Sequence, residues 1–76
     1  MINTQEAFDI IRTNLPDFSV QKQVLYDKWF IFVLTPPDPE EPDIFVKVSQ
    51  LTGIVLDFVP WNEPNPKAIE QALLNG

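Results

Sequence analysis

Six consecutive apolar residues, Trp29 to Leu34, constrain the fold of this 76-residue chain more than any other segment. Their side chains are bulky on both parities, and the run is rich in aromatic and β-branched residues. A run this short with these residue types is typical of a central strand rather than a helix. The sequence therefore predicts a sheet that contains residues 29–34 as an inner strand.

Three other segments have the pattern of strands. Residues 18–26 alternate apolar and polar side chains, which is typical of a strand with one solvent-exposed face. The residues on one parity are Phe18, Val20, Lys22, Val24 and Tyr26. Residues 44–48 and 54–59 are rich in Ile, Val and Phe, which favour strands. Short connections between successive strands predict an antiparallel meander.

Two of the connections carry turn signals. Asp27 and Lys28 predict a tight turn between the first two strands. Residues 49–53 predict a hairpin loop, because Gly53 can adopt the positive φ that such a loop needs just before the returning strand. We therefore expect each of these turns to pair the two strands that it joins.

A helix is predicted at each end of the chain. In the first, over residues 3–14, Asn3 and Glu6 have the spacing of a capping box. The second begins where Asn65 precedes Pro66, because proline is favoured at the first helical position. Its apolar stripe is short, so we expect this helix to depend on docking against the rest of the chain.

The order helix, four strands, helix indicates a single α+β domain over residues 1–76. We expect a four-stranded antiparallel meander with both helices on one sheet face. That face would contain one parity of residues 29–34, which the sequence leaves open, together with Ile44, Val46, Val48, Ile54, Leu56 and Phe58.

The opposite face of the predicted sheet carries more apolar side chains than an antiparallel sheet usually leaves in water. It receives the other half of residues 29–34 and five further side chains, Phe45, Lys47, Val55, Asp57 and Val59. Such a patch would expose ~300–600 Å², a size that often marks a binding surface. The alternative is that the acidic loop or the connector around Trp61 folds over this face and covers it.

The candidate protein-binding residues follow from this patch. They are Trp29, Ile31, Val33, Phe45, Val55 and Trp61. Aromatic residues at the centre of a polar-rimmed patch match the preferences of binding hot spots. Trp61 has a second interpretation, as a side chain that closes the end of a small core.

Residues 35–43 predict a stiff surface loop, because four prolines remove amide donors and four carboxylates favour water. The carboxylates are Asp38, Glu40, Glu41 and Asp43, and they form the candidate acidic surface. Their spacing does not match an EF-hand loop, and the interleaved prolines limit how they could converge on calcium. We therefore expect a solvated loop and no metal site.

The charge of the chain restricts its partners. Eleven acidic and five basic residues leave a net charge of −6. This charge argues against nucleic acid as a partner, because Lys and Arg supply most of a protein's affinity for nucleic-acid phosphates. A protein partner with a basic surface is favoured. In the absence of cysteine, a second copy of the chain is a further candidate for stabilising so small a core.

The residue inventory argues against catalysis. The chain has no His and no Cys, which removes the commonest general base, the thiolate nucleophile and most transition-metal ligands. Two glycines cannot build a phosphate-binding loop. We therefore predict no enzyme activity, no catalytic residues and no cofactor.

The chain lacks a run of about 20 apolar residues, so no membrane contact is expected. We expect the protein to be cytoplasmic or virion-associated.

The hairpin over residues 43–60 resembles a known type of module. Its strand, Thr52-Gly53 corner and returning strand are similar to the ending of small PepSY-like and immunity-protein-35-like modules of bacteria and their phages. The preceding helix and the strand at residues 29–34 fit the same order. The resemblance implies a non-catalytic protein-binding module.

These observations lead to two hypotheses. The first is a protein-binding accessory module, encoded by a phage or a bacterium, such as a small virion structural or decoration protein. The alternative is an inhibitor or immunity protein that binds and silences one effector through its acidic surface. The two differ in stoichiometry, because a decoration protein binds a repeating surface in many copies.

Overall fold

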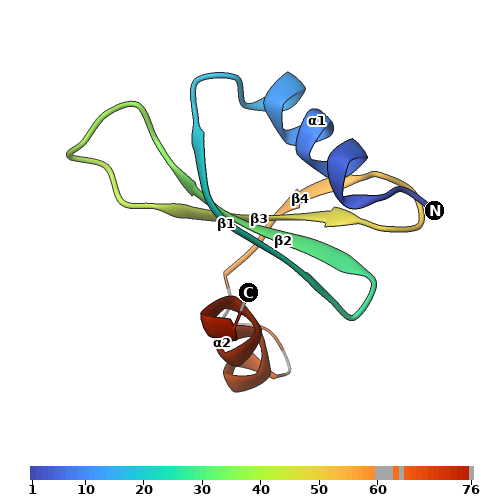
Figure 1. Cartoon of the computed structure of the whole chain (residues 1–76). Helices are drawn as coiled ribbons and strands as arrows, with labels where there is room; N and C mark the ends of the chain where they lie inside the picture. The colour runs from blue at the N-terminus through green and yellow to red at the C-terminus, as the bar shows by residue number, and fades with distance from the viewer. Residues whose placement is uncertain (60–62, 64, 76) are drawn as a thin grey trace.

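The computed structural model describes residues 1–59, 63 and 65–75. In this part of the chain two helices flank an antiparallel sheet, whose strands follow the order β1-β2-β3-β4 (Figure 1). The elements are α1 (Thr4–Asn14), β1 (Ser19–Tyr26), β2 (Trp29–Thr35), β3 (Ile44–Ser49), β4 (Val55–Asp57) and α2 (Pro66–Asn75). The predicted α+β class, element order and meander are confirmed.

Local sequence determines where α1 begins and ends. The Asn3 side chain accepts a hydrogen bond from the Glu6 amide at 2.8 Å, and the Glu6 carboxylate accepts one from the Asn3 amide at 3.2 Å. This is the predicted capping box. Leu15 ends the helix, because the following Pro16 disfavours helical geometry at that residue.

Both predicted turns are confirmed by the backbone. Asp27 and Lys28 have φ values of 48° and 67°, and two successive positive φ angles match the twist of a two-residue hairpin. Gly53 has a φ of 76°, and its amide donates to the Ser49 carbonyl at 2.8 Å. These turns connect β1 to β2 and β3 to β4.

The two helices lie on opposite faces of the sheet, which corrects the expectation that both share one face (Figure 1). The sheet face under α1 is here called the α1 face. Its buried residues are Phe30, Phe32, Leu34, Val46 and Val48, and they pack against Ala7 and Ile11 of α1. The face under α2, here called the α2 face, centres on Ile31, Ile69 and Leu73. The physical reason lies in β2, whose side chains are apolar on both parities and need cover on both sides.

A β-bulge in β1 corrects the expected alternation of residues 18–26. Val20 is aligned with Leu34 and Lys22 with Val33, so Gln21 is an extra residue on β1. An extra residue reverses the face on which the following side chains lie. Phe18 and Val20 therefore pack in the core of the α1 face, whereas Val24 and Tyr26 pack in the core of the α2 face.

The faces of β4 are also the reverse of those expected. Val55 is aligned with Val48 and packs with the core of the α1 face, and Leu56 is aligned with Lys47 of the opposite face. Residues directly opposite in an antiparallel pair share one face, so the register set by the hairpin loop decides the parity of β4. Phe58 accordingly packs with the core of the α2 face.

Candidate functional site

The structure brings four of the six candidate binding residues together. Trp29, Ile31, Val33 and Phe45 all belong to the α2 face. Val55 lies on the α1 face, so its placement in the patch is wrong. Trp61, and with it the connector proposed to cover the patch, lies outside the described residues.

Helix α2 covers the part of the α2 face formed by β1 and β2. Ile69 and Leu73 pack on Ile31, whose side chain is 2% exposed. The Lys22 ammonium group donates to the Leu73 carbonyl at 3.4 Å, which ties the end of α2 to β1. The centre of the expected patch is therefore core. Its remaining members, Trp29, Val33 and Phe45, are half-buried.

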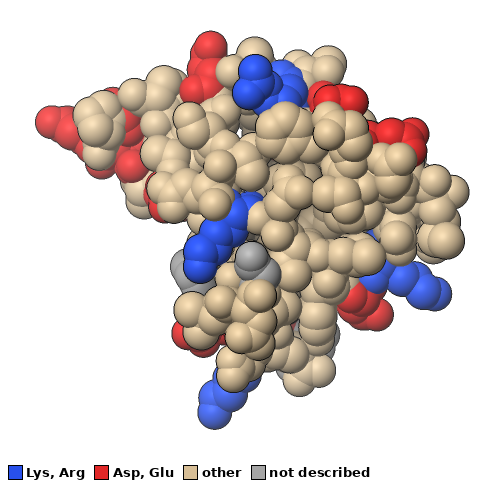
Figure 2. All heavy atoms as spheres, viewed as in Figure 1, with Lys and Arg blue, Asp and Glu red and all other residues tan. Residues whose placement is uncertain are grey.

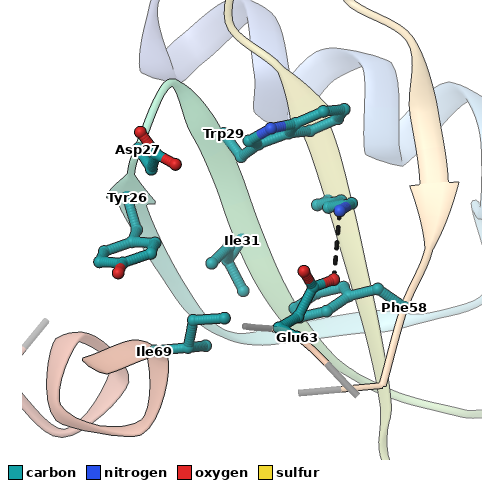
Figure 3. Close-up of a pocket in the computed structure, with 8 residues that line it drawn as sticks. Tyr26, Asp27, Trp29, Ile31, Phe58, Glu63 and Ile69 are labelled. Atoms are coloured by element: carbon teal, nitrogen blue, oxygen red, sulfur yellow. Dashed lines mark hydrogen bonds and ion pairs between the residues drawn. The ribbon is translucent and has the colours of Figure 1, made fainter. Parts of the chain in front are cut away.

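Lys47 occupies the middle of the α2 face between two aromatic rings. Its ammonium nitrogen lies 4.6 Å from the ring centre of Trp29 and 5.5 Å from that of Phe58. It also forms an ion pair with Glu63 at 3.2 Å, drawn as the dashed line in Figure 3. Positive charge over an aromatic face is attracted by the ring quadrupole, so Lys47 is stabilised from three sides.

The hollow around this ion pair is too small for a ligand. Its volume is about 50 Å³, and its walls include Tyr26, Ile31 and Ile69 besides the aromatic pair (Figure 3). Ligand sites in proteins usually have volumes of roughly 300–1,000 Å³, so this space is far below their range. The role of this cluster is to fasten Glu63, between β4 and α2, to the sheet.

A larger hollow lies where β3 begins and β4 ends. It has a volume of about 410 Å³ and is here called the β3–β4 hollow. Its lining residues within the described part of the chain are Pro42, Asp43, Ile44, Phe45, Asp57, Phe58 and Val59. Five of these seven residues are apolar and the other two are exposed carboxylates, so the hollow combines an apolar wall with negative charge.

Two aromatic rings pack against each other in the wall of this hollow. The rings of Phe45 and Phe58 are 6.0 Å apart and meet edge to face at 68°. The Phe58 amide donates to the Phe45 carbonyl at 3.3 Å, which continues the pairing of β3 and β4 beyond the end of β4. An edge-to-face pair is the geometry that aromatic quadrupoles favour, so the wall is preformed.

The acidic loop runs directly into the β3–β4 hollow. Asp38, Glu40, Glu41 and Asp43 are all exposed, as predicted, and the loop forms the left-hand tip where carboxylates gather in Figure 2. The Asp38 side chain accepts a hydrogen bond from the Glu40 amide at 3.0 Å, which shapes a local turn. Asp43 is the member of this set that also lines the hollow.

Several of the residues that line the β3–β4 hollow were not among the candidate site residues predicted from the sequence. Phe58 was expected under the helices, and Pro42 and Val59 were not singled out as site residues. The signal that could have found Phe58 is the length of the hairpin loop, since the register of β3 and β4 puts it opposite Phe45. The acidic loop and Phe45, predicted separately, meet in one hollow.

Comparisons with models of protein families, with curated proteins and with solved structures find no match to this chain. Neither of the helices within residues 1–59, 63 and 65–75 has the length and apolar character needed to cross a membrane. Over the same residues, no group of three or more acidic side chains is placed to hold a metal ion. The β3–β4 hollow, with the acidic loop beside it, is the candidate site.

Proposed function

We propose that this chain is a non-enzymatic protein-binding module and that its partner docks in the β3–β4 hollow. The observation that carries the proposal is the hollow itself, which is lined by the half-buried rings of Phe45 and Phe58 and by the exposed Val59. A volume of about 410 Å³ falls within the range of ligand and side-chain binding sites. Aromatic side chains are enriched at protein interfaces relative to the rest of the surface.

The residue inventory supports binding rather than catalysis. The chain contains no His and no Cys, and the ionisable groups that line the hollow are two exposed carboxylates. Catalytic acids and bases usually lie in the buried part of a cleft, whereas both of these carboxylates are exposed. The lead proposal is therefore an accessory protein of a phage or bacterium, such as a small virion structural or decoration protein, cytoplasmic or virion-associated.

The acidic loop supports a second proposal, an inhibitor or immunity protein. Asp43 joins the loop to the hollow, so a basic effector could contact both at once. Complementary charge across an interface speeds association and excludes wrong partners. An inhibitor would bind one effector in a defined ratio, whereas a decoration protein would cover a repeating surface.

Affinity capture with three versions of the full chain tests the docking site. Val59→Ser removes an apolar wall of the hollow, and Leu51→Ser removes another exposed apolar side chain, from the β3–β4 loop outside the hollow. We expect a protein retained by the original chain and by Leu51→Ser to be lost with Val59→Ser. Circular dichroism of each variant checks that the fold is retained.

Equal retention by all three versions would overturn the proposal that the hollow is the docking site. If a partner is lost only with Val59→Ser, native mass spectrometry of the captured complex separates the two functions. One copy of this chain per effector supports the inhibitor. Many copies on an oligomeric surface support the virion protein.

A further inference from the structure

We propose that the β3–β4 hollow recognises a basic–apolar segment of a partner protein, in which one large apolar side chain lies between two Lys or Arg residues. The apolar side chain enters the hollow against Phe45 and Phe58, and the cations pair with Asp43 and Asp57. This inference rests on the proposed function of the hollow as a docking site and specifies its ligand.

The wall of the hollow selects an apolar side chain. Phe45 and Phe58 present an edge-to-face pair with their centres 6.0 Å apart, and Ile44 and Val59 also line the hollow. A hollow of about 410 Å³ has room for one large side chain with the backbone that carries it. Burying that side chain removes apolar surface from water on both partners.

The two carboxylates flank the aromatic pair along the direction of the strands. Asp57 is aligned with Val46 and so lies on the side of the α1 face, whereas Asp43 comes directly before β3, three residues before Val46. A strand rises about 3.3 Å per residue, so the backbone positions of the two carboxylates are roughly 10 Å apart. Both carboxylates line the same hollow, so the long side chains of Lys or Arg on either side of a central apolar residue can reach them from its opening.

No cation within the described ranges neutralises these carboxylates. The ion pair found among those residues joins Lys47 to Glu63, and Lys47 is held there by the rings of Trp29 and Phe58. The described lining of the hollow contains neither Lys nor Arg. The negative charge of Asp43 and Asp57 is therefore available to a partner.

Charge also decides between a foreign segment and a second copy of this chain. Each copy carries a net charge of −6, and its acidic loop adjoins the hollow. Two copies docked through this surface would bring like charges together, which opposes association. A basic segment from another protein meets the same surface with opposite charge.

Three capped pentapeptides test the assignment on the full-length chain labelled with ¹⁵N. The probe is Gly-Lys-Phe-Lys-Gly, and the two controls are Gly-Glu-Phe-Glu-Gly and Gly-Lys-Ser-Lys-Gly. In titrations followed by heteronuclear NMR, we expect the Lys-Phe-Lys probe to shift the amides of residues 43–45 and 57–59. Neither control should produce these shifts at the same concentration, and added salt should weaken binding.

Charge-neutral variants identify the partners of the two cations. Asp43→Asn and Asp57→Asn should each lower the affinity for the Lys-Phe-Lys probe about two- to fivefold, the range expected for exposed ion pairs. Asp9→Asn makes the same change on the exposed side of α1, outside the hollow, and should leave the affinity unchanged. Equal losses for all three variants would mean that net charge alone attracts the probe, which overturns the assignment.

The outcomes separate this inference from the proposal beneath it. If the Glu-Phe-Glu peptide shifts the same amides as strongly, the basic ligand is wrong but the hollow still binds an apolar side chain. If the Lys-Ser-Lys peptide binds equally well, the apolar anchor is wrong. If no peptide shifts residues 43–45 or 57–59, both the ligand and the docking site are overturned.

Discussion

The two faces of the sheet are covered to different degrees. On the α1 face, Phe30, Phe32, Leu34, Val46 and Val48 are each at most 3% exposed. On the α2 face the buried sheet residue is Ile31, and its neighbours remain half-buried. The difference arises because α1 closes over the middle of the sheet, whereas α2 packs beside β1 and β2 and leaves the ends of β3 and β4 to the hollow.

This comparison separates a stabilising surface from a binding surface within one small sheet. The side chains of the α1 face are buried under α1, so they contribute mainly to stability. The α2 face is closed on one side by a ten-residue helix and retains apolar rings on the other. Substitutions should therefore affect stability strongly on the first face and more weakly on the second.

The largest expected effect is that of Phe32→Ala, in the centre of the α1 face. The Phe32 side chain is fully buried, and truncating such a residue costs about 3–5 kcal/mol. That loss is comparable to the whole stability of a small domain. We expect circular dichroism to show a largely unfolded chain at 25 °C. A cooperative unfolding transition close to that of the unmodified chain would contradict the assignment of this face as the main core.

Ile69→Ala tests the cover of the α2 face. Ile69 is 5% exposed and anchors α2 on Ile31, so we expect a loss of about 2 kcal/mol, near the lower end for such a change. Hydrogen exchange should accelerate in α2 more than in β2, because α2 is too short to persist once it is undocked. Uniform acceleration in both elements would show instead that the two faces unfold as one unit.

Lys47→Met tests the ion pair that fastens Glu63 to the sheet. The substitution keeps an apolar stem between Trp29 and Phe58 but removes the charge, and we expect a loss of about 1 kcal/mol or less in urea unfolding. Glu63→Gln is the matched variant, since it breaks the same pair without removing Lys47. A stability gain in either variant would indicate that desolvation outweighs the attraction.

The smallest predicted effect is a gain in stability from Lys28→Gly in the β1–β2 turn. Lys28 has a φ of 67°, which glycine adopts without steric cost, so we expect about 0.5 kcal/mol of added stability. Both faces share this hairpin, and the gain should appear in thermal unfolding without changing the relative exchange rates of α1 and α2. Destabilisation by Lys28→Gly would contradict the two-residue turn.

Much of the architecture could be predicted because it depends on neighbours in the chain. The capping box of Asn3 and Glu6, the stop before Pro16 and the positive φ of Gly53 each involve contacts within a few residues. The inner position of residues 29–34 follows from their apolar parity on both sides. The exposure of the acidic loop follows from its carboxylates and prolines.

The site was predicted only in part, because its geometry depends on strand register. One extra residue, Gln21, moves Val24 and Tyr26 from the face of Val20 to the opposite face. The alignment of β3 with β4 moves Val55 out of the predicted patch and brings Phe58 into it. The alternation of side chains along a strand indicates which residues share a face, but it does not indicate which helix or strand packs against that face.

The sequence by itself determined the class of the fold, the order of its elements and the turns that join its hairpins, since these follow from local backbone preferences and apolar patterning. Only the tertiary structure decided which face each helix covers and where apolar surface remains. Those outcomes depend on a β-bulge in β1 and on the register of β3 with β4, which bring together side chains far apart in the chain. The β3–β4 hollow exists for that reason.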